Sequence, residues 1–170
     1  GRSGTTFTAA ALNRMGVDSL SSGETVGWAM ECMEKGLLNR DDLDGLDFSW
    51  GNTGTVETLL PMIVRREGIG DFFAEGTRSL SQKFGRGTEE YAFQVKGLDM
   101  ICGDPRGIKA FGLTYAIASR GADHLRAEPF FELTGRYEEA ERRFGTREAG
   151  DRLSDHGKAA LVEYTERQAL

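Results

Sequence analysis

Glycines recur along this chain at the positions where helical stretches stop. The sequence has 23 glycines but only 3 prolines in 170 residues. A glycine directly after an apolar-periodic stretch supplies the left-handed backbone that terminates a helix. Gly16, Gly36 and Gly68 each follow such a stretch. The pattern predicts an all-α, multi-helical chain with at most one short β-strand near residues 91–96, where apolar and polar side chains alternate.

Apolar side chains at helical spacing define the expected helices. Val26, Ala29, Met30 and Met33 follow the i, i+3, i+4, i+7 pattern, after a stretch, Ser21–Glu24, with capping-box spacing. Residue spacing predicts further helices over 5–15, 53–67, 72–84, 108–119, 137–144 and 154–170. The last of these reaches the end of the chain without a capping residue. We therefore expect residues 1–170 to be a fragment of a longer protein.

Composition excludes several classes of partner. The net charge is −6 and the isoelectric point is about 5.1. An acidic chain has little affinity for nucleic acid or for an anionic membrane surface, so neither partner is expected. The longest nearly apolar run, Leu59–Val64, contains Pro61 and is far too short to cross a bilayer. The first ten residues lack the basic and apolar regions of a signal peptide.

The two cysteines, Cys32 and Cys102, are far apart and form no CxxC motif. A disulfide framework is therefore not expected, and a cytoplasmic location is the simpler interpretation. Cys32 lies on the apolar face of its helix and is predicted to be a core residue. Cys102 precedes a turn of interest, and a buried structural thiol is favoured there over one that faces a ligand.

The segment Gly97–Arg126 concentrates the residues that are able to carry chemistry. A turn, Asp104–Gly107, precedes a helix of small residues, and His124 follows a second turn after that helix. An imidazole in this setting suits general acid–base catalysis, whereas the alternative is a surface histidine. The other histidine, His156, lies near a helix start, and no function is predicted for it.

Two further turns are candidates for ligand binding. Arg106, next to Asp104, has the planar fork that matches phosphate oxygens, although an ordinary turn with a surface ion pair explains the same residues. Asn13, Gly16 and Asp18 place an amide, a backbone turn and a carboxylate where they suit a polar heterocycle. Helix-end chemistry is the alternative for these three residues, and the residues alone favour it.

Four motifs occur in an order that resembles one protein family. They are LNRMGVDSLSSGETVGWAMECMEKGLL, FSWGNT, RREGIGDFFAEGT and DPRG…FGLTYAIASRGADH. In this order they resemble the helical C-terminal part of the aldehyde ferredoxin oxidoreductase family, over about residues 13–126. The resemblance implies a tungsten ion held by two pterins of the molybdopterin type, near a [4Fe–4S] cluster. It also implies oxidation of small aldehydes to carboxylates, with electrons leaving through ferredoxin.

The resemblance assigns roles to individual residues. The family's pterin motif D-x-x-G-L-D/C corresponds to residues 13–18. Gly16 and Asp18 match it, Val17 is a conservative change, and Asn13 replaces the first aspartate. His124 corresponds to a histidine close to the tungsten, a candidate proton carrier or hydrogen-bond donor to the substrate. Basic charge near the cofactor is expected from Arg126 and from Arg106, which follows Asp104 in DPRG.

The departures from the family pattern concern the substrate and the metals. Some members carry a tyrosine immediately before DPRG that reaches the substrate pocket, and Gly103 here implies a more open or differently polar pocket. An E-x-x-H metal motif is missing, with Phe7 and Ala10 at its positions. The cluster-binding cysteines and the second pterin motif are expected outside residues 1–170, as is the family's N-terminal β-rich domain.

The sequence leaves three functions open. The first is part of the catalytic subunit of a tungsten–pterin aldehyde oxidoreductase, which contacts the rest of its parent subunit and ferredoxin. The second is a tungsten reductase of aromatic thioesters in the same superfamily. The third is a helical assembly or docking module without catalysis. A homodimer is an open option in each case, and tungsten is not distinguished from molybdenum.

Overall fold

The computed structural model describes residues 10–100, 103–127 and 129–169. Most of these residues are helical, and the described part of the chain contains one two-stranded sheet. The predicted helical class is therefore confirmed. The chain divides into two compact units, Gly1–Phe93 and Gln94–Leu170. The sheet of the second unit begins at Gln94, so the two units follow each other directly, without a linker between them.

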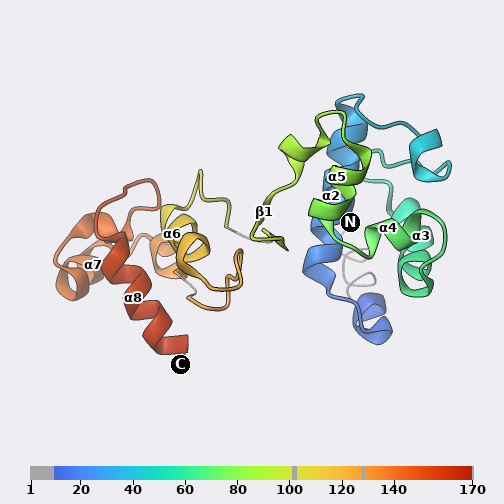
Figure 1. Ribbon diagram of the computed structural model, residues 1–170. Helices are drawn as coiled ribbons and strands as arrows, with labels where there is room; N and C mark the ends of the chain where they lie inside the picture. Colours follow the sequence, from blue (N-terminus) through green and yellow to red (C-terminus); the bar gives the residue numbers. More distant parts are fainter. Residues whose placement is uncertain (1–9, 101–102, 128, 170) are drawn as a thin grey trace. The chain divides into compact units, whose positions relative to one another are not determined.

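The first unit is built around α2, Ser19–Glu34, drawn in blue in Figure 1. Trp28, Ala29 and Cys32 of this helix are buried in the main core cluster. The indole N–H of Trp28 donates to the carbonyl oxygen of Thr88 at 3.0 Å, so its polar atom is satisfied inside the core. The other elements are η1 Asp41–Leu43, α3 Thr53–Arg65, α4 Ile69–Phe73, α5 Thr77–Phe84 and η2 Thr88–Tyr91.

Helix starts in this unit follow the side-chain acceptors in the sequence, with one correction. Asn52 caps α3 by accepting from the backbone N–H of Thr55, directly before the helix predicted over residues 53–67. The predicted start of α2 at Ser21–Glu24 is wrong. Asp18 is the residue that caps α2, because its carboxylate accepts from two backbone N–H groups of the first turn.

The single helix predicted over residues 72–84 is two helices, α4 and α5. Gly76 has a φ of +82° between them, which no α-helix accommodates. The early start of α4 has a packing reason at Gly70. A Cβ atom there would lie 2.3 Å from the backbone carbon of Met62 in α3, so the two helices approach as only glycine permits.

The second unit opens with a hairpin of β1 Gln94–Val95 and β2 Leu98–Asp99. Lys96 and Gly97 between them have φ values of +56° and +89°, as in a two-residue hairpin turn. The single strand predicted near residues 91–96 is therefore corrected to the shorter first strand of a pair. The remaining elements are α6 Lys109–Ile117, η3 Phe130–Thr134, α7 Tyr137–Phe144, η4 Arg147–Gly150 and α8 Lys158–Ala169.

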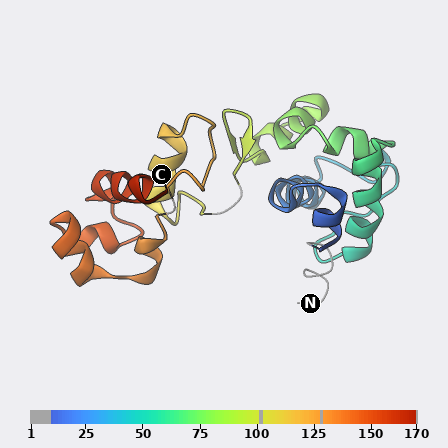
Figure 2. The same cartoon turned by 90° about the horizontal axis from the view of Figure 1, so that it is seen from below.

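Helices α6 and α8 lie side by side in both views (Figure 1 and Figure 2). Ala110 of α6 packs with Leu161 and Val162 of α8 in a small buried cluster. Leu161 and Val162 lie in the helix predicted over residues 154–170, and both are core residues. None of the described helices combines the length and apolar character that crossing a membrane requires.

A buried ion pair ties this unit together. Lys158 Nζ lies 2.6 Å from Glu132 Oε2, and both side chains are at most 5% exposed. The ammonium group also donates to the carbonyl oxygens of Ala149 and Asp151. Glu132 Oε1 accepts from the backbone N–H of Ala110 in the first turn of α6. One pair of charges therefore joins η3, η4, α6 and α8, and nothing in the sequence pattern indicates it.

Candidate functional site

The loop that carries His124 is fixed to the hairpin on one side. Gly121 has a φ of +100°, and a Cβ atom on it would lie 1.9 Å from the carbonyl oxygen of Val95. The ammonium group of Lys96 donates to the carbonyl oxygen of Ala118, the C-cap of α6, at 2.8 Å. The turn that follows α6 is thereby held against β1, and only glycine fits at the contact.

Asp123 closes the same loop by local interactions. The residue is 7% exposed. Its carboxylate accepts a hydrogen bond from the backbone N–H of Leu125 at 3.1 Å and forms an ion pair with Arg120 at 3.3 Å. His124 is half-buried between Asp123 and Leu125. Asp123, His124 and Arg126 thus lie in a loop whose backbone has a defined shape. A histidine that acts as an acid–base catalyst must be held in position in this way.

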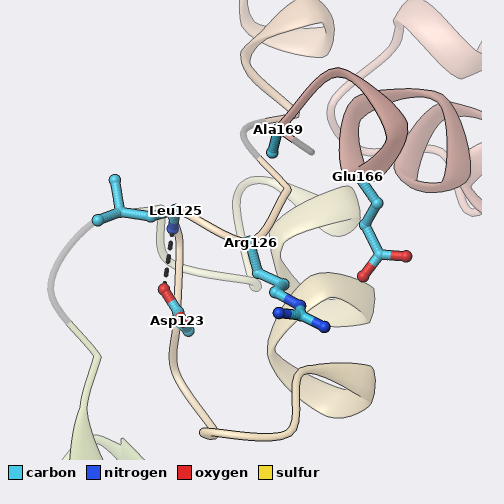
Figure 3. A pocket seen from close by; sticks show the side chains of 5 residues that line it. All are labelled: Asp123, Leu125, Arg126, Glu166 and Ala169. Carbon is cyan, nitrogen blue, oxygen red and sulfur yellow. Dashed lines mark hydrogen bonds between the residues drawn. The ribbon is translucent and has the colours of Figure 1, made fainter.

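A pocket of about 270 Å³ is lined in part by the sequence neighbours of His124. Its lining comes from the loop and from the end of α8: Asp123, Leu125, Arg126, Glu166 and Ala169. Figure 3 shows the guanidinium of Arg126 and the carboxylate of Glu166 extending in the same direction. The structure thus brings one predicted residue, Arg126, into a concave site. Glu166, 40 residues further along the chain, is a lining residue that the sequence did not indicate.

The turn Asp104–Gly107 is an exposed turn with an internal ion pair. The guanidinium of Arg106 donates to both carboxylate oxygens of Asp104, at distances between 2.6 and 3.0 Å. Hydrogen bonds from the side chain of Arg106 hold the pKa of Asp104 below its usual range. This geometry is the surface ion pair that the sequence left as the alternative to phosphate binding. An incoming phosphate has to compete with Asp104 for the same donors.

Gly103 does not open space beside this turn. Its φ is +72°, and a Cβ atom would lie 2.6 Å from the ring of Phe111, which is fully buried. The direction that a side chain at position 103 would take is filled by that ring. The Phe111 ring occupies the space beside Gly103, and the expectation of a more open or differently polar substrate pocket stays a prediction.

Replacing Gly103 with alanine is expected to lower the free energy of unfolding by about 2–5 kcal/mol, from left-handed strain and overpacking on Phe111. Chemical denaturation of the chain measures this loss. Gly107→Ala is the matched control, since its Cβ would meet no atom closer than 3.8 Å and its φ is not left-handed. Equal losses in both variants would contradict the role given to Phe111.

The segment Asn13–Asp18 lies in the first unit, as an exposed connection between a helical segment over residues 10–15 and α2. Gly16 has a φ of +70°, with no atom within 4 Å of a Cβ built on it. Asn13 is exposed, and Val17 is half-buried at the turn. Asp18 accepts from the N–H groups of Leu20 and Ser21 at 3.3 and 3.1 Å. The helix-end chemistry is confirmed for Asp18, and the space beside Gly16 is open.

The cysteines provide no metal site within the described residues. Cys32 is fully buried, and burial raises the pKa of its thiol to about 12. A protonated core thiol is not a ligand, which confirms the core interpretation of Cys32. Cys102 lies outside the described residues. Across the ranges that the structure describes, no group of three or more histidine, cysteine or acidic side chains is arranged to hold a metal ion.

Comparison with known proteins identifies the family. A family model described as aldehyde ferredoxin oxidoreductase, domains 2 and 3, matches residues 6–170. The chain belongs to this family of oxidoreductases, as the four ordered motifs predict.

Individual relatives agree with this assignment. The tungsten-containing aldehyde ferredoxin oxidoreductase of Pyrococcus furiosus is 38% identical over 115 residues, which cover 67% of this chain and 19% of that protein. The protein of the same name from Thermococcus kodakarensis is 37% identical with the same coverage. A second Pyrococcus furiosus protein, the aliphatic sulfonate oxidoreductase, WOR-like subunit, is 32% identical over 137 residues, 76% of this chain and 22% of its own length. The chain spans about a fifth of each relative.

Proposed function

We propose that this chain is part of the catalytic subunit of a tungsten–pterin oxidoreductase that oxidises small aldehydes to carboxylic acids and passes the electrons to ferredoxin. The family match over residues 6–170 carries the proposal. It is supported by the two similar proteins that are tungsten-containing aldehyde ferredoxin oxidoreductases. In this proposal residues 1–170 belong to the helical domains, and the β-rich domain and the cluster cysteines lie elsewhere in the parent protein.

The described residues fit a pterin at Asn13–Asp18. The space beside Gly16 is open, and Asn13 and Asp18 lie on either side of it in the sequence. The carboxylate of Asp18 is an acceptor of the kind that the ring N–H groups of a pterin require. Asn13 offers an acceptor and a donor without charge. When bound, the tungsten–pterin centre supplies the two-electron chemistry.

In this proposal, residues of the second unit transfer a proton and supply positive charge. His124 holds or moves a proton at an imidazole nitrogen, in a loop whose shape is set by Gly121 and Asp123. Arg126 places positive charge beside His124, and Arg106 is the candidate for an anionic oxygen if Asp104 releases it. These roles are assigned from the motif positions, and none requires a metal ligand from residues 1–170.

Tungsten and pterin analysis of the intact parent protein, purified anaerobically, tests the proposal. We expect about one tungsten and two pterins per chain, with reduction of a viologen dye that depends on added aldehyde. A parent protein that contains neither metal nor pterin would support the docking-module alternative.

A second candidate concerns the substrate. The relative named as an aliphatic sulfonate oxidoreductase covers more of this chain than the two aldehyde enzymes do. A metal-loaded parent protein that ignores aldehydes but reduces the dye with an aliphatic sulfonate would favour this candidate. Activity in the reverse direction on an aromatic thioester would favour the reductase alternative.

A further inference from the structure

Two opposite charges line the pocket after His124 without contacting each other. Arg126 and Glu166 both form its wall, and neither makes an ion pair or hydrogen bond with the part of the chain that the structure describes. Asp123, the third charged lining residue, is already paired with Arg120. The pocket therefore presents one unmatched guanidinium and one unmatched carboxylate to the same volume (Figure 3).

The charges of the lining select against several ligand classes. A phosphate carries about −1.5 to −2 charges at neutral pH, and the carboxylates of Asp123 and Glu166 repel it. Arg126 repels a purely cationic ligand, and Glu166 repels a purely anionic one. A ligand with both an ammonium and a carboxylate matches the two unmatched groups together.

The volume restricts the size of the ligand. At about 270 Å³ the pocket is smaller than the roughly 300–1,000 Å³ of sites for drug-sized molecules. Ala169 adds a small apolar group to the lining at the end of α8, which suits a short alkyl chain.

We propose that this pocket binds a small zwitterion, an amino acid with a short alkyl chain between its ammonium and carboxylate groups. The guanidinium of Arg126 receives the carboxylate as a two-pronged donor, and the carboxylate of Glu166 receives the ammonium. The site lies within one unit of the chain, so binding does not require a metal centre or electron transfer. Its failure is therefore distinguishable from failure of the redox proposal.

Three ligands of equal chain length test the inference: 5-aminopentanoate, pentanoate and pentylamine. Each is titrated into the intact, isotope-labelled parent protein, and backbone amide shifts are followed by nuclear magnetic resonance. For 5-aminopentanoate we expect saturable shifts at Leu125, Arg126 and Ala169, with a Kd on the order of 1 mM. Pentanoate and pentylamine, which each satisfy one charge, are expected to bind at least tenfold more weakly.

Variants assign the two ends of the ligand. Arg126→Met and Glu166→Gln should each weaken 5-aminopentanoate binding about tenfold, and in E166Q the preference over pentanoate should disappear. Arg142→Met is the matched control, because Arg142 is an exposed arginine of the same unit and lies outside the pocket. Its variant should bind like the unmodified chain.

Several outcomes overturn the inference. Equal binding of all three ligands to the unmodified chain would show that the pocket does not discriminate charge. Absence of pocket shifts at about 10 mM 5-aminopentanoate, roughly tenfold above the expected Kd, would show that it is not a site for this class. Equal weakening in R126M and R142M would indicate non-specific attraction. The first two outcomes use only the unmodified chain and do not depend on the folding of any variant.

Discussion

Replacing Lys158 with methionine is expected to lower the free energy of unfolding of the second unit by about 3–5 kcal/mol at neutral pH. Methionine fills a similar volume, so the loss comes from the charge left behind on Glu132, whose side chain is fully buried. The variant also leaves the carbonyl oxygens of Ala149 and Asp151 without the ammonium donor. Urea denaturation, followed by circular dichroism, measures the change.

The loss in K158M should depend on pH with a defined sign. Burial, the dominant cause, already raises the pKa of Glu132, and Lys158 acts against this shift. Without Lys158 the folded-state pKa rises further above the unfolded value, so the folded state binds the proton more tightly. Stability of the variant then increases as the pH falls from the folded pKa towards the unfolded pKa near 4.5. The difference from the unmodified chain should shrink accordingly.

Two comparisons isolate the buried pair. Lys109→Met removes a lysine of the same unit whose nearest acidic partner, Asp155, is 3.9 Å away at the surface, and should cost at most about 1 kcal/mol. The double variant K158M/E132Q keeps an oxygen for the N–H of Ala110 and removes the unpaired charge, so it should be more stable than K158M alone. A K158M loss no larger than that of K109M would show that the pair does not hold the unit together.

The helices were predictable because local signals agree with the packing. Helix α7 has the predicted bounds, and the glycine stop at Gly36 is observed, since apolar spacing and a left-handed residue point to the same boundary. The boundary between α4 and α5 was missed for a physical reason. The residues around it are apolar at helical spacing, and the close approach of Gly70 to α3 is a tertiary contact without a local signature.

The candidate site was predictable only in part. His124 and Arg126 were predicted from a motif that resembles the family's, and the turn around them is visible as glycine and charge in the sequence. Glu166 was not predictable, because it joins Asp123 and Arg126 through the packing of α8 near their loop. The contact between Gly103 and the Phe111 ring, eight residues later, is another tertiary contact without a local signature in the sequence.

In the intact parent enzyme, His124→Ala is expected to lower kcat by about 10²–10⁴-fold while tungsten and pterin content stay unchanged. The expectation rests on the proposed function, with His124 as the group that carries a proton during turnover. The loop should keep its shape in the variant, because Gly121 and the Asp123 contacts with Leu125 and Arg120 hold it without the imidazole. Steady-state kinetics over a range of pH, with metal analysis of the same sample, measures both quantities.

His156→Ala is the matched control for this experiment. His156 is the only other histidine of the chain, its side chain is 79% exposed, and it lies near the start of α8. Its replacement should leave kcat and the pH profile unchanged. A pH profile that loses one ionisation in H124A but not in H156A identifies His124 as the proton carrier. Unchanged turnover in H124A, with full tungsten content, would remove His124 from the mechanism and leave the family motif at residues 120–126 with a structural role.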